Sequence, residues 1–167
     1  GVRVTNGVNA SGTFPAVVAL RLQSGPVTAS CTGTFVNDSQ VVTAAHCVRA
    51  ITEVGGEPRD IKFVRERKNG DVDEVDALQF AYHPEYVDDP LILNNHDVAV
   101  VTFPRNSAPS VVKLYDKRPR VGQEFTIVGF GLNDYDRDKY GNQVGTGGGV
   151  KRMGLSLIHI SEPTRPE

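Results

Sequence analysis

An all-β fold is predicted for this chain of 167 residues by its short strand-like runs, its turn residues and its lack of helical periodicity. Runs rich in valine, threonine, isoleucine and phenylalanine recur between turn signals, and 17 glycines and 10 prolines are scattered through the chain. No window shows a long repeat at helical spacing. Many short strands separated by turns favour a β-sandwich or a β-barrel.

The expected strands follow one another along most of the chain. In order they are Ala16–Leu22, Ser30–Val36, Gln40–Ala44, Ile61–Arg67, Val75–Tyr82, Val98–Phe103 and Phe125–Phe130. Asn69-Gly70 follows the fourth run and is a strong hairpin dipeptide. The polar, glycine-rich stretch Asn133–Gly149 is interpreted as a long surface loop or a linker.

Composition excludes some classes of partner. Hydrophobic residues make up 39% of the chain and charged residues 23%, which is ordinary for a soluble globular protein. The net charge of -2 indicates no basic surface for nucleic acid, and no apolar run approaches the ~18 residues that a membrane helix needs. We therefore expect neither a nucleic-acid nor a membrane partner.

The first chemical motif is CTGTFVNDSQVVTAAHC, from Cys31 to Cys47. It resembles the stretch of trypsin/chymotrypsin-like serine proteases in which two strands lead into an Ala-Ala-His-Cys motif. The resemblance implies a chymotrypsin-like double β-barrel and assigns His46 as the catalytic histidine. The small residues Ala44 and Ala45 suit this role, because they let the backbone beside the histidine pack closely.

Cys31 and Cys47 are the two cysteines of the chain. Free thiols of a cytosolic protein and half of a metal site are alternatives to a disulfide. Metal sites usually show close pairs such as C-x-x-C, and that spacing is absent here. The family resemblance implies a Cys31–Cys47 disulfide, which favours an oxidising compartment and a secreted protein.

The second motif is NNHDVAVVTF, from Asn94 to Phe103. It resembles the family's Asn-Asp-Ile-Ala-Leu-Leu segment, in which an aspartate precedes an apolar strand, and it assigns Asp97 as the catalytic aspartate. A buried carboxylate needs compensation, and a hydrogen bond from the histidine ring provides it. The alternative is an ordinary turn aspartate at the start of a strand. His96 departs from the family pattern, because asparagine often holds that place.

The remaining candidate residues receive no catalytic or metal role. His83, His96 and His159 are interpreted as surface or satisfied core histidines. An acidic group offers oxygen atoms suited to calcium, but its spacing forms no specific motif, so a solvated acidic face is favoured over a metal site: Glu66, Asp71, Asp73, Glu74 and Asp76. No metal and no cofactor is predicted.

The nucleophile is expected to lie outside this chain. The order His46 before Asp97 is the chymotrypsin order, in which the serine follows the aspartate by roughly 90 residues. The chain contains no Gly-Asp-Ser-Gly-Gly motif, and neither Ser156 nor Ser161 has such a setting. The chain by itself is therefore expected to be inactive.

The amino terminus resembles the activation junction of a zymogen. Arg3 is the expected cleavage site, and Val4 is the expected new terminus that an activating protease would expose. The alternative is a frayed, solvated terminus.

The expected organisation has four parts. Residues 1–3 are the end of a propeptide, residues 4–105 form a complete first barrel, residues 106–154 form an incomplete second barrel, and residues 155–167 are a tail. Within that tail, Leu155–Arg165 resembles the translated sequence of a DNA-sequencing adapter, so the tail is interpreted as an artefact.

These observations predict a secreted serine endopeptidase that acts on protein or peptide substrates. One alternative is a catalytically inactive protein of the same fold that acts as a binding module, which the residue at the serine position would reveal. Another is an unrelated β-barrel binding protein, in which the two cysteines should not be bonded.

Overall fold

The computed structural model describes residues 8–89, 91–92, 95–130, 134–137, 143–146 and 151–157. Within these ranges the chain is mostly β-structure, with one α-helix, α1 (Ala45–Thr52), and one 3-10 turn, η1 (Pro58–Asp60). No helix in the described part of the chain is long and apolar enough to span a membrane.

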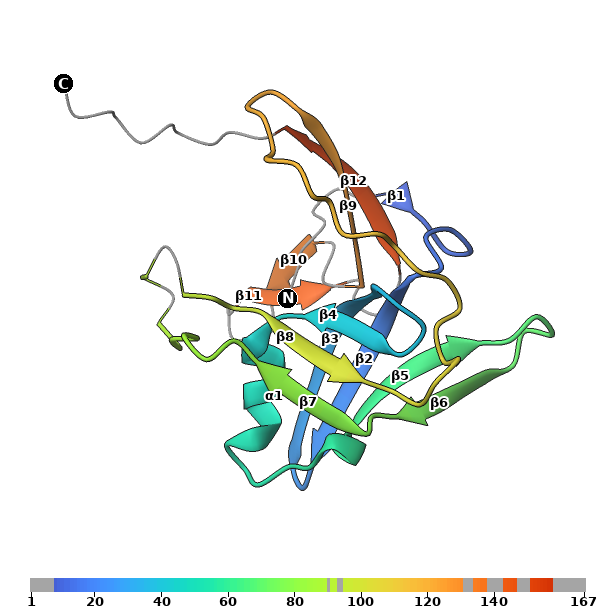
Figure 1. Cartoon of the computed structure of the whole chain (residues 1–167), viewed down its shortest axis with the longest axis vertical. Helices are drawn as coiled ribbons and strands as arrows, with labels where there is room; N and C mark the ends of the chain where they lie inside the picture. The colour runs from blue at the N-terminus through green and yellow to red at the C-terminus, as the bar shows by residue number, and fades with distance from the viewer. Residues whose placement is uncertain are drawn as a thin grey trace.

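A seven-stranded antiparallel sheet forms the main body, seen in the lower half of Figure 1. Its order is β6-β5-β2-β3-β4-β8-β7. The strand bounds are β2 Val17–Ser24, β3 Val27–Phe35, β4 Gln40–Thr43, β5 Ile61–Glu66, β6 Val72–Asp76, β7 Gln79–Tyr82 and β8 Ala99–Thr102. The edge strands β6 and β7 are joined by two residues, so the sheet must curl until its edges meet at that corner.

The predicted single strand Val75–Tyr82 is wrong, because the chain changes partners in its middle. The backbone N–H of Ala77 donates to Ile61 O at 2.8 Å, and that of Leu78 donates to Thr102 O at 2.8 Å. The first bond belongs to the β5 side of the sheet and the second to the β8 side. The run therefore divides into β6 and β7, at opposite edges of the curled sheet.

The Asn69-Gly70 turn connects β5 to β6 as the sequence predicts. Gly70 has φ +86°, a region that glycine enters without steric cost. Asn69 Oδ1 accepts a hydrogen bond from the Asp71 N–H at 3.0 Å, which closes the turn.

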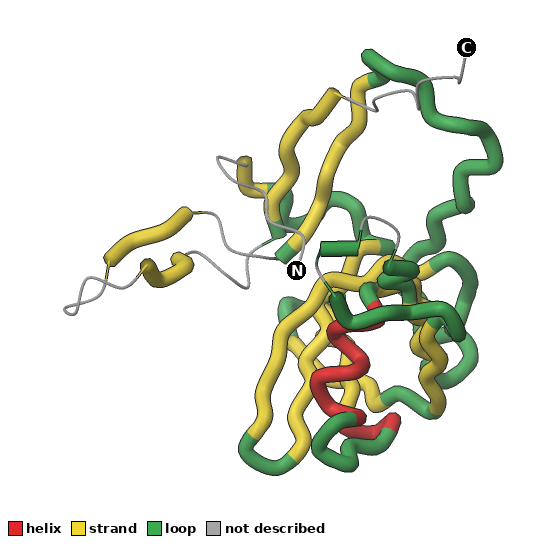
Figure 2. Tube along the Cα trace, turned by 90° about the vertical axis from the view of Figure 1, so that its left-hand side faces the viewer, coloured by secondary structure: helices red, strands yellow, loops and turns green. Residues whose placement is uncertain are grey.

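A smaller three-stranded sheet has the order β1-β12-β9, with β1 Val8–Asn9, β9 Glu124–Gly129 and β12 Arg152–Leu157. It lies above the main body in Figures 1 and 2. The chain's first described strand thus pairs in this second sheet. Strand β12 continues past Gly154, and Leu155 pairs with Thr126. The origin of the tail from residue 155 onward stays a prediction.

The predicted loop Asn133–Gly149 contains secondary structure that the sequence analysis missed. Strands β10 (Asp134–Arg137) and β11 (Gln143–Thr146) pair antiparallel as a separate two-stranded sheet. Polar and glycine-rich composition concealed them, because neither strand carries an alternating apolar face.

The core of the main body is built around three phenylalanines. Phe35, Phe63 and Phe103 are each at most 1% exposed, and their ring centroids lie 4.9–5.9 Å apart. Such tilted and edge-to-face contacts suit aromatic quadrupoles. The curled seven-stranded sheet and the smaller second sheet confirm the predicted all-β fold class.

Candidate active site

His46 lies in the first turn of α1, directly after strand β4. Ala44 is extended, with φ -83° and ψ 140°, and Ala45 begins the helix. Ala45 is fully buried and Cys47 is 2% exposed, whereas the His46 side chain is 44% exposed. The backbone of the histidine is thus embedded in the core while its ring reaches the surface. Figure 2 shows the helix against the strands of the main body.

A disulfide between Cys31 and Cys47 fixes this helix to strand β3. The S–S distance is 2.01 Å and the Cα atoms lie 6.4 Å apart. Thr43 adds a second link, because its Oγ1 donates to Thr32 O at 2.9 Å. The predicted pairing is therefore present, and both features tie the residues around His46 to one strand.

Asp97 contacts His46 twice. Asp97 Oδ2 lies 2.6 Å from His46 Nδ1, and Asp97 Oδ1 accepts the backbone N–H of His46 at 2.8 Å. The two residues are 51 positions apart in the chain. Strand pairing brings them together, because Thr43 at the end of β4 pairs with Ala99 at the start of β8.

The second of these contacts also caps α1. The N-cap residue Ala44 makes no side-chain cap hydrogen bond. The first amides of a helix have no partner within the helix, and a negative charge there is favourable. Asp97 supplies both the acceptor and the charge from a distant segment. The carboxylate therefore orients the ring and stabilises the helix that carries it.

The pKa of Asp97 lies below its ordinary value. Partial burial raises the pKa of this carboxyl, but hydrogen bonds from the His46 ring and amide and from the Ala45 amide outweigh it, together with the charge of the ring. The carboxylate is thus held ionised, which is the form that accepts an Nδ1–H hydrogen bond.

His96 adopts the left-handed backbone conformation directly before Asp97, with φ +52°. Its carbonyl oxygen accepts the Val98 N–H at 2.7 Å, so the chain turns sharply around Asp97. Asparagine, aspartate and histidine are the residues other than glycine most enriched in this region. Histidine at position 96 is therefore compatible with this turn.

Further charged and aromatic side chains lie close to the site, and the sequence analysis gave them no role. Tyr86 donates to Asp88 Oδ1 at 3.1 Å, and the Arg49 guanidinium lies 5.9 Å from the Tyr86 ring centroid. Burial and the neighbouring carboxylates Asp88 and Asp97 raise the pKa of Tyr86 to about 12. No local motif marks Tyr86, because its position depends on the folding of the segment between β7 and β8.

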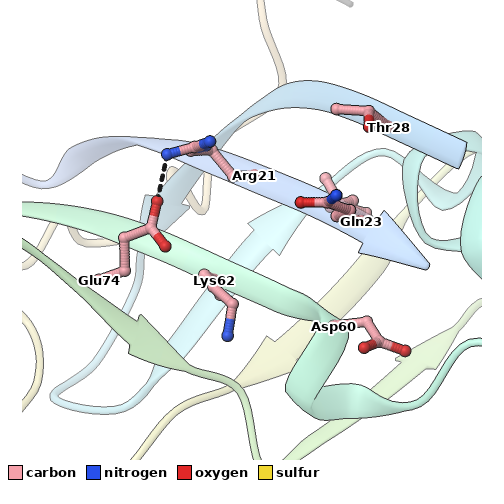
Figure 3. A pocket seen from close by; sticks show the side chains of 7 residues that line it. Arg21, Gln23, Thr28, Asp60, Lys62 and Glu74 are labelled. Carbon is pink, nitrogen blue, oxygen red and sulfur yellow. Dashed lines mark hydrogen bonds and ion pairs between the residues drawn. The ribbon is translucent and has the colours of Figure 1, made fainter. Parts of the chain in front are cut away.

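The acidic group considered for calcium is largely engaged with cations. Asp73 accepts hydrogen bonds from Arg65 and Arg67, Glu74 pairs with Arg21, and Asp76 pairs with Lys62. Glu74 also lines a small hollow together with Arg21 and Lys62, and Figure 3 shows the ion pair between Arg21 and Glu74 there. Neither His46 nor Asp97 lines this hollow.

Several predicted residues lie outside the described part of the chain. They are Arg3 and Val4 of the activation junction, and His159 and Ser161 of the tail. The backbone of Ser156 is described and pairs with Phe125 in the second sheet.

Comparisons with known proteins bear on the family and the fold of the chain. The family model described as Trypsin matches residues 4–152. HL collagenase resembles the structure with a TM-score of 0.65 and 18% sequence identity, over 92% of this chain and 63% of that one. Granzyme C (GrC) matches with a TM-score of 0.64 and 18% identity, over 92% of this chain and 64% of that one. The chain thus spans less than two thirds of either protein. No curated protein sequence matches it.

Proposed function

Since the chain belongs to the trypsin family, we propose that it supplies the catalytic histidine and aspartate of a secreted serine endopeptidase. His46 is the general base and then the general acid, and Asp97 orients the ring and stabilises its positive charge. These roles follow the worked triad template for chymotrypsin. In this proposal the attacking serine and the oxyanion-hole amides are supplied by a longer protein, and this chain by itself is expected to be inactive.

The observation that carries this proposal is the paired contact between Asp97 and His46. An aspartate that only closes a turn at the start of a strand would be expected to contact the nearby backbone and not a distant histidine ring. Here one carboxylate oxygen lies 2.6 Å from His46 Nδ1 and the other accepts the His46 amide at 2.8 Å. An acceptor on Nδ1 favours the tautomer that carries its proton there, which leaves the lone pair of Nε2 to accept a proton from a serine.

The reaction in the longer protein has two stages. A serine hydroxyl attacks the peptide carbonyl while His46 accepts the hydroxyl proton, and the resulting imidazolium gives that proton to the departing amine. Water then attacks the acyl-enzyme with the same histidine acting as base, which releases the second product and restores the serine. Asp97 stays ionised throughout, which agrees with its lowered pKa.

The family also implies the other parts of the proposal. Trypsin-family proteins act on peptide bonds, so protein or peptide substrates are expected. The Cys31–Cys47 disulfide supports an extracellular location. Cleavage after Arg3 would expose Val4 as the new amino terminus of an active enzyme. We retain the division into a first barrel at residues 4–105, a partial second barrel at 106–154 and an artefactual tail.

The test is to amplify the source DNA across the codons for Gly154 and to sequence it without transposase adapters. We expect the reading frame to continue into a Gly-Asp-Ser-Gly-Gly motif without the segment from Leu155 to Arg165. A continuing frame with another residue at the serine position would contradict the proposal and favour a binding module. A tail that is genuinely encoded and ends near Glu167 would contradict it as well.

A further inference from the structure

Two histidines and a glutamate gather next to the catalytic pair, where the segment after β7 meets the residue before Asp97. His83 follows β7, Glu85 lies two residues later, and His96 precedes Asp97. One nitrogen or oxygen atom from each side chain lies within 4.8 Å of the other two. Distant parts of the sequence thus place three potential metal ligands around one point.

We propose that His83, Glu85 and His96 form a binding site for Zn²⁺. Zinc in proteins is bound by imidazole nitrogen and carboxylate oxygen at about 2.0–2.2 Å, commonly in tetrahedral geometry. A set of two histidines and one glutamate supplies three ligands and leaves the fourth position to water. Calcium and magnesium prefer sets made entirely of oxygen, so this donor set selects a transition metal.

The side chains need only local adjustment to bind the ion. The two imidazole rings are stacked, with centroids 4.4 Å apart and planes 15° apart. His96 Nε2 lies 3.7 Å from Glu85 Oε2. Two nearly parallel rings direct their lone pairs along separate planes, so one ring must rotate for both to reach one ion. The intermediate exposure of both histidines and the 72% exposure of the Glu85 side chain permit that rotation.

One existing hydrogen bond competes with the metal. The backbone N–H of Glu85 donates to His83 Nδ1 at 3.1 Å. If the ion binds Nδ1, it displaces this bond. If it binds Nε2, the ring must carry its proton on Nδ1, and the same bond is again lost. Zinc binding therefore exchanges one exposed hydrogen bond for a coordination bond at His83.

The backbone holds the ligands in place on both sides. The His83 N–H donates to Val98 O at 2.9 Å, which fixes His83 across from the start of β8. The Val87 N–H donates to Asn95 O at 3.0 Å, which ties the segment after Glu85 to the residue before His96. The three ligands are therefore presented by two chain segments, after β7 and before β8, that backbone hydrogen bonds already join. The zinc site does not depend on the proposed catalytic roles of His46 and Asp97.

The test is a titration of the untagged 167-residue chain with Zn²⁺ by isothermal calorimetry. We expect one equivalent of zinc to bind, and we expect the ring-nitrogen NMR signals of His83 and His96 to shift. His83→Asn, His96→Asn and Glu85→Gln should each weaken binding by more than about tenfold, since loss of even an outer partner of a metal ligand typically costs that much. Asparagine is chosen at position 96 because it tolerates the left-handed backbone there.

Matched controls separate this site from other sources of binding. Glu124→Gln and His159→Gln should bind zinc as the parent chain does. Thermal unfolding without zinc should show that each variant is folded. The proposal is overturned if no zinc binds to the folded parent chain. It is also overturned if His46→Ala abolishes binding while His96→Asn does not, because the ion would then lie at the catalytic pair.

Discussion

Replacing Asp97 separates its two structural roles, because alanine removes both contacts and asparagine keeps one acceptor. Asp97→Ala leaves the amino terminus of α1 without its cap and the His46 ring without its partner. Asp97→Asn can still accept the His46 amide through its side-chain oxygen. His46→Ala removes the ring contact but leaves the amide at position 46 capped by Asp97.

The expected losses follow from these contacts. Removing an N-cap costs about 1 kcal/mol, and a hydrogen bond to a charged group contributes about 1.5–3 kcal/mol when buried. The Asp97 side chain is 28% exposed and the His46 side chain 44%, so the ring contact is expected at or below the lower end. We expect Asp97→Ala to lose about 2 kcal/mol of unfolding free energy, the sum of the two contacts, and Asp97→Asn and His46→Ala about 1 kcal/mol each.

Urea denaturation of the 167-residue chain at pH 7 measures these differences. The chain has no tryptophan, so far-ultraviolet circular dichroism is the suitable signal. Asp116→Ala is the matched control, because Asp116 is an exposed loop aspartate, and its stability should change by less than about 0.5 kcal/mol. The reasoning is refuted if His46→Ala costs as much as Asp97→Ala, since the amide contact would then contribute nothing.

Three further predictions concern the disulfide, a crowded glycine and acid. Replacing Cys31 and Cys47 by alanine should lower the unfolding free energy by about 3 kcal/mol, the loop-entropy value for a loop of about 15 residues. The stability of this double variant should not change when reductant is added. Equal stability of the parent chain and the double variant would contradict the prediction. Gly33→Ala should lower the unfolding free energy by about 1–3 kcal/mol through overpacking, because the new Cβ would lie 2.3 Å from Val41 Cγ1. Thr28→Ala, at an exposed position on the same strand, is the control. Equal losses of stability in the two variants would contradict the crowding at Gly33. Because the pKa of Asp97 is lower in the folded state, its contribution to the unfolding free energy is complete above the unfolded-state pKa of about 3.9 and is lost as pH falls through the folded-state pKa. The unfolding free energy of Asp97→Ala should therefore fall less steeply with decreasing pH than that of the parent chain. Identical pH profiles for the two proteins would exclude this contribution.

Most of the strands could be predicted because their signals are local. β2, β3, β4, β5, β8 and β9 each fall within or close to a run of β-branched and apolar residues. The site residues were predictable from motifs, and the structure places His46 beside Asp97 and bonds Cys31 to Cys47. Their catalytic roles remain a proposal.

The features that the sequence analysis missed depend on long-range pairing or on segments too short to show a period. Helix α1 has eight residues, which is little more than two turns. Its cap is provided by Asp97, 51 residues away from His46, so no local capping pattern announces it. The stacking of His83 on His96 likewise joins segments on either side of the loop between β7 and β8. Sequence spacing alone therefore assigned these two histidines no role.

The most direct test of the central claim is the peptidase activity of the proposed longer protein, activated by the proposed cleavage after Arg3. The kcat for peptide hydrolysis should fall by several orders of magnitude in His46→Ala. Asp97→Asn should lower kcat by about 10⁴-fold, as in the triad template, because the asparagine amide favours the wrong tautomer of the ring. Comparable KM values would show that substrate still binds. Activity that survives both substitutions, in a protein shown to be folded, would contradict the assignment of His46 and Asp97 as the catalytic pair.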